Sequence, residues 1–560
     1  MPAKALTRLV TIKAQYGGDV AREKRDLVRQ LGRRRLVGAS QVERLHETLC
    51  FLHAYPDDLA LFREVARALG RFRSRGDLRQ HREQLVDTGI AGTEIYYRFH
   101  ASTALWLAER WPEQLSLDWD ELDAAELDRR LHLLVLYSES PGLDEPPLPF
   151  RAWLDRLRGQ ETDATFLIRR LLAQPLPWLL RNRCYDSLRL MIHLSPGPET
   201  PSRTGPRFSG SPFVPQPVPL RRQRPDLSAK ILRGTKRIRA ASRQEAEELI
   251  DLARESMVTR SRDLYTFEAA DPRDVRIVDC GHGLELACIG VLPEVRFLLE
   301  AVYGWLLLRN GVPLGYALSS ALWQSAEIAF NVFATFRGAE AAWIYANLLA
   351  SVRQLFDVDT FTIYPYQLGH GNEEALESGA WWFYYKLGFR PRDPAVTDLA
   401  RAETQRMARR PSHRSSLRTL RRLAERNLFL ELGSRRQDVI GVVATDRVGT
   451  AVSDALTRRF GSDRERAELA CADEVADLLW AGSWRRLPEA ERLAWRRWAP
   501  MVAILPGVAR WSPDERRALV DVIRAKGARR ESDFVERFDR HSRLRAAVRA
   551  LARNGRRMEE

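Results

Sequence analysis

Residues 326–338, AEIAFNVFATFRG, decide the fold. The first part of this stretch alternates in the way of a β-strand, and the rest forms a short loop that contains a glycine. The loop leads into an apolar-periodic segment that ends near Phe356, as expected of an amphipathic helix. A second strand-like run occupies residues 360–364, and residues 377–389 predict a further helix and the start of a last strand. This order of elements predicts a sheet whose central loop could hold an anion.

The residues before this stretch predict further strands of the same sheet. Asn310 and Gly311 separate two apolar runs, and both residue types tolerate positive φ, so we expect a β-hairpin there. Residues 245–253 carry an apolar stripe at helical spacing. We therefore expect a central domain, residues 242–395, with a mixed, mostly antiparallel sheet flanked by helices. Its earlier strands are expected at Val275–Val278, Leu284–Ile289, Trp305–Arg309 and Val312–Leu318.

The rest of the chain divides by composition. Residues 1–195 carry apolar stripes at helical spacing and predict an all-α domain. Residues 196–241 are rich in proline and glycine, which disfavour helix and central strand, so we expect a linker or an extended strap. Residues 396–560 return to helical patterns and are rich in arginine. A chain of 560 residues is too long for one ordinary core, which indicates a multidomain α+β protein with all-α domains at both ends.

The net charge of +15 comes almost wholly from arginine, since seven of the 89 basic residues are lysine. Arginine suits phosphate and carboxylate recognition, but so uniform a bias is typical of a compositional preference of the source genome. A nucleic-acid partner is therefore compatible with the charge and not favoured by it. No apolar run reaches about 18 residues and no secretory signal is evident, so we expect no membrane span and a cytoplasmic protein.

The five cysteines are scattered and odd in number, which argues for a reducing compartment. Cys280, His282 and Cys288 lie close together in the sequence. Their spacing matches no common zinc pattern and no fourth ligand is evident. The sequence therefore predicts no metal site.

The central domain resembles the GNAT N-acetyltransferase superfamily at two motifs. In that family the fourth strand leads into a loop of pattern Arg/Gln-x-x-Gly-x-Gly/Ala, which holds the pyrophosphate of acetyl-CoA together with the start of the next helix. Free N–H groups and the helix dipole make such a place an anion site. The resemblance implies acetyl-CoA or another acyl-CoA as co-substrate. The matching cofactor-binding residues are Arg337, Gly338, Ala339, Ala341 and Ala342.

The second motif is the family's Ala-x-x-x-Tyr-x-Lys-x-Gly-Phe, which appears here as residues 380–389 without a gap. In many relatives the tyrosine that matches Tyr384 is the general acid for the departing thiolate. A phenol suits that role because its ordinary pKa, near 10, keeps it protonated at neutral pH. The resemblance thus implies that Tyr384 is catalytic, although a purely packing role is the alternative.

Acyl transfer to an amine also needs a base and a group that binds the oxyanion. Glu327, on the fourth strand, and His370, in the loop after the fifth strand, are the two candidate bases, and resemblance does not choose between them. A backbone N–H near Phe333 is the expected oxyanion donor. The sequence does not name the amine.

Two residues depart from the family pattern. Glu340 stands where relatives carry glycine, and Glu377 stands where they usually carry asparagine. A carboxylate at position 340 would repel a pyrophosphate and would itself satisfy the helix dipole. Two alternatives therefore stay open: a non-catalytic interaction protein with a degenerate CoA site, whose helical domains bind a protein partner, and a nucleic-acid-associated protein that uses the arginine-rich segment 401–426.

Overall fold

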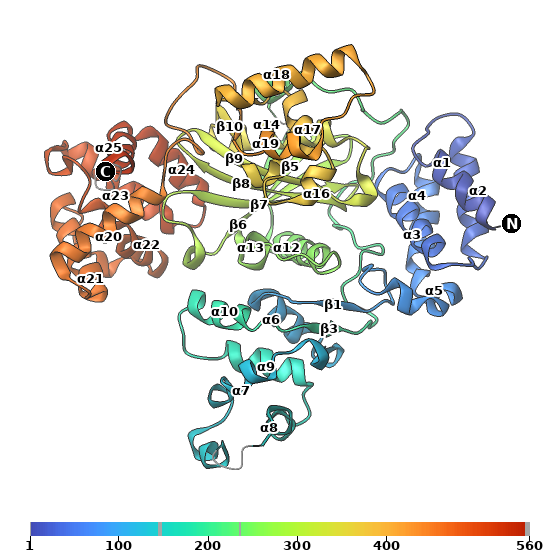
Figure 1. Ribbon diagram of the computed structural model, residues 1–560, viewed down its shortest axis with the longest axis horizontal. Helices are drawn as coiled ribbons and strands as arrows, with labels where there is room; N and C mark the ends of the chain where they lie inside the picture. Colours follow the sequence, from blue (N-terminus) through green and yellow to red (C-terminus); the bar gives the residue numbers. More distant parts are fainter. Residues whose placement is uncertain (1, 144–147, 235–236, 555–560) are drawn as a thin grey trace.

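The computed structural model describes residues 2–143, 148–234 and 237–554. A nine-stranded sheet forms its centre, with strand order β11-β12-β10-β9-β8-β7-β6-β5-β4 (Figure 1). All neighbouring strands are antiparallel except β9 and β10, which are parallel. The expected mixed, mostly antiparallel sheet is confirmed. Its strands are β4 (Arg237–Ala240), β5 (Ala270–Gly281), β6 (Leu284–Val291), β7 (Ala301–Arg309), β8 (Val312–Leu322), β9 (Ser325–Val332), β10 (Thr360–Ile363), β11 (Arg390–Pro391) and β12 (Leu428–Glu431).

The predicted hairpin joins β7 and β8. Asn310 has φ 51° and Gly311 has φ 78°, which is the left-handed pair that a tight hairpin turn requires. Pro313 follows at a shift in the register between Leu307 and Leu308, where its missing N–H does least harm to the ladder. The local sequence therefore fixes both the turn and its bulge.

The parallel pair β9–β10 separates soon after it forms. The register joins Ser325, Ala326 and Glu327 to residues 360–362, and β9 then continues to Val332 without β10 beside it. The short 3₁₀ turn Ala334–Phe336 and α14 (Ala341–Phe356) connect the two strands on one face of the sheet. Beyond β10 lie α15 (Pro365–Leu368), α16 (Glu373–Glu377) and α17 (Ala380–Lys386).

Helices cover the two faces of the sheet differently. The ring of Tyr303 on β7 lies 5.0 Å from that of Phe356, so this residue faces α14. Gly304, its neighbour on the opposite face, approaches α13 so closely that a Cβ there would lie 2.6 Å from Thr266 Oγ1. This second face is covered by α12 (Arg243–Val258), which begins with a capping box from Ser242, and by α13 (Tyr265–Glu268).

The N-terminal part contains two separate hydrophobic clusters. The first belongs to a helical bundle at one end of the molecule. The second belongs to residues 95–194, which we call the lower lobe after its place in Figure 1. The bundle consists of α1 (Pro2–Ile12), α2 (Val20–Gly32), α3 (Ala39–Ala54), α4 (Leu59–Gly70) and α5 (Gly76–Gln80).

The lower lobe differs from the all-helical expectation because it includes a small three-stranded sheet of order β1-β3-β2. Its strands are only three residues each, too short to show a period of two in the sequence. The lobe comprises β1 (Ile95–Tyr97), α6 (Ala101–Arg110), β2 (Leu115–Leu117), α7 (Ala124–Asp128), α8 (Phe150–Leu157), α9 (Asp163–Leu172), α10 (Trp178–Ser187) and β3 (Ile192–Leu194).

The proline-rich segment 195–226 is an extended strap rather than a free linker. Phe208 donates its N–H to Gly311 O (2.9 Å), and Asn310 Nδ2 donates to both Val214 O (3.0 Å) and Ala54 O (2.9 Å). The strap thus joins the N-terminal bundle to the hairpin. The end of the predicted linker, up to residue 241, instead forms α11 (Leu227–Arg233) and the edge strand β4.

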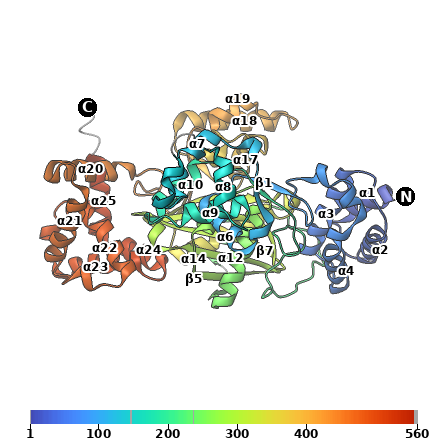
Figure 2. The ribbon, with the colours of Figure 1, turned by 90° about the horizontal axis from the view of Figure 1, so that it is seen from below.

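The C-terminal part begins with α18 (Pro394–Arg409) and α19 (Leu417–Leu423) and then adds β12 to the sheet between β10 and β11, which the helical expectation for residues 396–560 missed. The remaining helices lie at the end opposite the N-terminal bundle (Figures 1 and 2). In the described residues, no helix is long and apolar enough to span a membrane. These helices are α20 (Asp446–Phe460), α21 (Arg464–Leu479), α22 (Glu489–Val502), α23 (Pro513–Gly527), α24 (Glu531–Arg540) and α25 (Ser542–Asn554).

Candidate functional site

A cavity of about 300 Å³ opens where β9 and β10 separate. Its walls come from the end of β9, the loop after it, the first turn of α14, and α16–α17. The volume is at the lower end of the range for small-molecule sites. The lining residues that matter most are Phe330, Val332, Arg337, Gly338, Ala341 and Tyr384.

The edge of β9 that faces this cavity carries backbone groups with no strand beside them. Phe333 donates its N–H to Leu314 O (2.8 Å), on the β8 side. N–H directions alternate along an antiparallel strand, so those of Phe330 and Val332 point to the β10 side, beyond the last β9–β10 pair at Glu327. The N–H of Phe333 itself is occupied, whereas the nearby N–H groups of Phe330 and Val332 face the cavity, so an oxyanion donor near Phe333 stays a prediction.

The loop after β9 gives the cavity its anion-binding character. Gly338 has φ 80°, a conformation that costs glycine little, and this turn brings the chain into α14. The first N–H groups of α14 have no intrahelical acceptor, and Ala341 at this helix start lines the cavity. Of the other predicted cofactor-binding residues, Arg337 and Gly338 line the cavity, and Phe333, Ala339 and Ala342 do not.

Glu340 is turned away from the cavity. Its side chain is 2% exposed, accepts the N–H of Arg221 (3.0 Å), and lies 3.6 Å from Arg309 Nη1. The carboxylate therefore faces Arg309 and the strap rather than the cavity, which the sequence alone could not show. Whether it repels a pyrophosphate stays a prediction. Glu377, the second departure, is exposed and outside the cavity lining.

Tyr384 is buried among aromatic rings and still reaches the cavity. The rings of Tyr345, Phe383 and Phe389 lie 5.2–5.8 Å from its own. Burial raises the pKa of the phenol well above its ordinary value, so the hydroxyl keeps its proton. Its hydroxyl makes no hydrogen bond within the described residues, which leaves the proton available to a molecule in the cavity.

Glu327 lies at the apex of the split, on the face that α13 covers. Its direct partner on β8 is Ser320, whose hydroxyl donates to Glu300. Burial, with a smaller contribution from the charge of Glu300, raises the pKa of Glu327 to about 7. Phe330, by contrast, packs on Tyr345 of α14, so the carboxylate and the cavity wall lie on opposite faces of β9.

His370, the other candidate base, is exposed and is not among the residues that line the cavity. A residue that the sequence did not suggest lies closer. Glu374, at the start of α16, lines the cavity, and its carboxylate binds Arg337 and Arg262, with Arg262 Nη2 at 3.2 Å. The sequence did not indicate Glu374, because its place at the cavity depends on how α16 packs against the loop.

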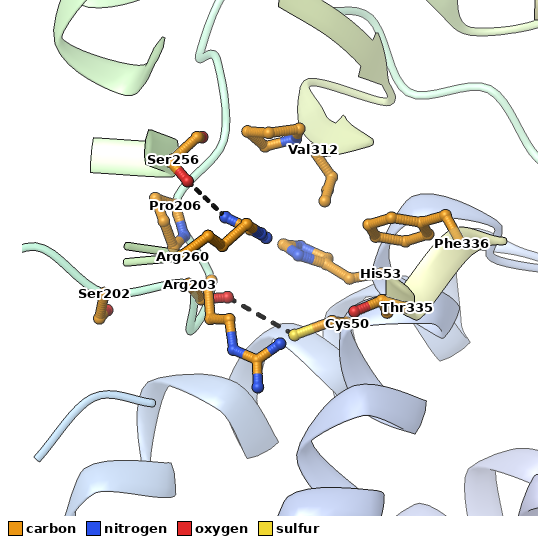
Figure 3. A pocket seen from close by; sticks show the side chains of 12 residues that line it. Cys50, His53, Ser202, Arg203, Pro206, Ser256, Arg260, Val312, Thr335 and Phe336 are labelled. Atoms are coloured by element: carbon orange, nitrogen blue, oxygen red, sulfur yellow. Dashed lines mark hydrogen bonds between the residues drawn. The ribbon is translucent and has the colours of Figure 1, made fainter. Parts of the chain in front are cut away.

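The loop is supported from behind by the N-terminal bundle. Thr335 donates its hydroxyl to Glu47 of α3, and the guanidinium of Arg260 stacks 3.7 Å from the ring centroid of Phe333. A small cavity of about 20 Å³ lies at this junction, where Cys50 and His53 of α3 meet Thr335 and Phe336 (Figure 3). Its size suits one water molecule.

Searches of protein-family models, of curated proteins and of solved structures find no match for this chain.

Proposed function

We propose that this protein transfers an acyl group from acyl-CoA to an amine. The observation that carries the proposal is the unpaired edge of β9, which faces a cavity bounded by a glycine-containing loop, a helix start and a buried tyrosine. Each of these parts offers one kind of recognition that acyl-CoA needs. The GNAT-like arrangement of the central sheet belongs to the same proposal.

The diphosphate would bind at the loop and the first turn of α14. Backbone N–H groups and the positive end of a 16-residue helix favour an anion there, and Ala341 leaves room for it. Arg337 lies in the loop and pairs with the carboxylate of Glu374. On binding of acyl-CoA it would leave this carboxylate and bind a phosphate oxygen instead.

The pantetheine arm would extend along β9. It is an extended chain with amide groups, and such chains bind free strand edges through main-chain hydrogen bonds. The free N–H groups of Phe330 and Val332 are the donors on that edge. One of them, nearer the split, would hold the oxyanion of the tetrahedral intermediate.

The reaction needs two proton transfers. Neither Glu327 nor His370 lines the cavity, and the raised pKa of Glu327 favours it as the base. The base takes a proton from the amine as its nitrogen attacks the thioester carbonyl. The C–S bond then breaks, and Tyr384 protonates the departing thiolate. Glu327 would approach the split from the α13 face, and the thioester would approach it from the α14 face. The amine and the acyl-CoA would therefore meet between the separated strands.

Binding of acetyl-CoA to the full chain, measured by calorimetry, tests the site. Ala341→Glu places a carboxylate at the cavity, and the helix start tolerates it. We expect at least tenfold weaker binding. Ala395→Glu is the matched control, since it adds the same charge to the exposed first turn of α18, another 16-residue helix, and should leave binding unchanged.

Release of free CoA in the presence of an amine panel tests the reaction. Binding without any release would favour the non-catalytic alternative. Absence of binding for acetyl-CoA and for longer acyl-CoAs at millimolar concentration would refute the proposal.

A further inference from the structure

Two carboxylates and a histidine converge where the lower lobe meets α13. His100 precedes α6, Asp263 lies between α12 and α13, and Glu268 ends α13. One ligand atom from each lies within 4.8 Å of the other two, and His100 Nδ1 is 3.3 Å from Glu268 Oε1. An imidazole and two carboxylates make a donor set suited to divalent first-row metals, whose ligands lie about 2.0–2.2 Å away.

These carboxylates lack the arginine partners that are common elsewhere in the chain. Within the described residues, neither Asp263 nor nearby Asp186 forms an ion pair, and Glu268 pairs only with His100. Asp186, Asp263 and Glu268 thus place three carboxylates around His100, whose imidazole pairs with Glu268. The group therefore attracts positive charge, and no lysine or arginine side chain supplies it by direct pairing.

Hydrogen bonds hold these carboxylates in place. Asp263 Oδ1 accepts the hydroxyl of Thr103 (2.7 Å), and Oδ2 accepts the N–H of His100 (3.0 Å). Asp186 Oδ1 accepts the N–H of Ala101 (2.7 Å). Such bonds from outside a donor set orient the ligands of a metal and strengthen its binding.

Tyr185 supplies an independent sign of a missing ligand. It is 2% exposed, and its hydroxyl is buried without any hydrogen-bond partner. Burial raises the pKa of this phenol, and the charges of Asp186 and Asp263 lie near enough to raise it further. Tyr185 lines a cavity of about 310 Å³ that His100 and Asp186 also line. Leaving a buried hydroxyl unpaired is unfavourable, and a bound water would supply the partner that the described residues do not.

We propose that His100, Asp263 and Glu268 bind one divalent first-row transition metal ion, and that the hydroxyl of Tyr185 bonds to a water on that ion. Binding displaces the proton of the His100 imidazole into solvent, so the ion competes with that proton. Of the three ligands, His100 also lines the cavity beside Tyr185. The ion would join α6 of the lower lobe to α13 of the central sheet.

Calorimetric titration of the metal-free, tag-free full chain with Zn²⁺, and separately with Mn²⁺, tests this site. We expect one ion per chain. Glu268→Gln and His100→Ala should each weaken binding at least tenfold. His132→Ala removes an exposed histidine of the same lobe and should leave the affinity unchanged. Tyr185→Phe should weaken binding about tenfold, because the loss of a hydrogen bond from outside the donor set typically costs about that much in metal affinity.

The electron paramagnetic resonance signal of bound Mn²⁺ gives a readout that does not depend on stability. If His100→Ala fails to fold, Glu268→Gln alone decides, since it keeps the shape of the side chain. Absence of stoichiometric binding by the unaltered chain at about 100 µM metal would overturn the proposal. An equal loss of affinity in His132→Ala and Glu268→Gln would do the same.

Discussion

At the scale of single residues, the environment of a side chain decides its chemistry more than its position in a motif does. Glu340 stands where the loop pattern has glycine, yet its carboxylate contacts Arg309 and the N–H of Arg221 and is turned away from the cavity. Tyr384 matches its motif, and burial keeps its hydroxyl protonated and unpaired. Glu327 belongs to neither family motif, and burial raises its pKa to about 7, which suits a general base at neutral pH.

Tyr384→Phe should slow CoA release from acyl-CoA about 10²-fold or more, because general acids contribute about that much. The KM for acyl-CoA should change little, since only the hydroxyl is removed. Tyr345→Phe is the matched control, because that hydroxyl is also buried and unpaired but lies outside the cavity lining. Steady-state kinetics compare the two variants. Equal activity of Tyr384→Phe and the unaltered chain would assign Tyr384 to packing.

The rate should rise with pH through about 7, the value to which burial raises the pKa of Glu327, since a base must be ionised. Stability should change in the opposite sense. The folded state binds this proton more tightly than the unfolded state, so the contribution of Glu327 falls between about pH 4.5 and 7.

Glu327→Gln should remove the rise in rate and stabilise the chain at pH 8 by up to about 3 kcal/mol. The pH–rate profile and urea unfolding at pH 5 and pH 8 measure the two effects. A profile that keeps its rise in Glu327→Gln would transfer the role to another group, with His370 as the first candidate.

Glu374→Gln should tighten acyl-CoA binding by about two- to fivefold. The change releases Arg337 from its carboxylate partner and removes a negative charge from the cavity. Calorimetry at low and high salt measures it, and the gain should shrink at high salt because charges near the surface are screened. Glu377→Gln, outside the cavity lining on the same helix, is the control.

At the scale of elements, the long strands and the hairpin were predictable because their signals are local. The alternation of residues 326–333 and the Asn310-Gly311 turn both hold in the structure. β12 was not predictable, since its four residues gain their conformation by pairing with β10 and β11, amid arginine-rich helices. The cavity followed from the order of elements, whereas His100, Asp263 and Glu268 come together only through the docking of the lower lobe.

Gly311→Ala should destabilise the hairpin and the strap together. Residue 311 has φ 78°, and an added Cβ would lie 2.5 Å from Phe208 O. We expect a loss of about 2 kcal/mol or more in the free energy of unfolding, from backbone strain and the displaced strap. Urea unfolding measures the loss. Gly507→Ala, at a left-handed position with open space around it, should cost only about 1 kcal/mol.

At the scale of the whole molecule, the C-terminal helices share one hydrophobic cluster with the large sheet, whereas the N-terminal bundle and the lower lobe have clusters of their own. Charged groups reinforce this shared core. Lys526 and Glu531 form a fully buried ion pair (2.6 Å), and Arg296 donates to Lys526 O (2.8 Å) and Ala528 O (2.6 Å). The C-terminal helices are therefore expected to unfold together with the sheet.

The spatial order of the strands in the large sheet differs from their order in the sequence. β10 is synthesised well before β12, which finally separates it from β11. On the ribosome, the growing sheet therefore exposes the edge of β10 until residues 428–431 have left the exit tunnel. An exposed strand edge is a template for pairing with other chains. A pause in translation within the arginine-rich stretch 401–426, before β12, would therefore lengthen that exposure and favour pairing of β10 with another chain.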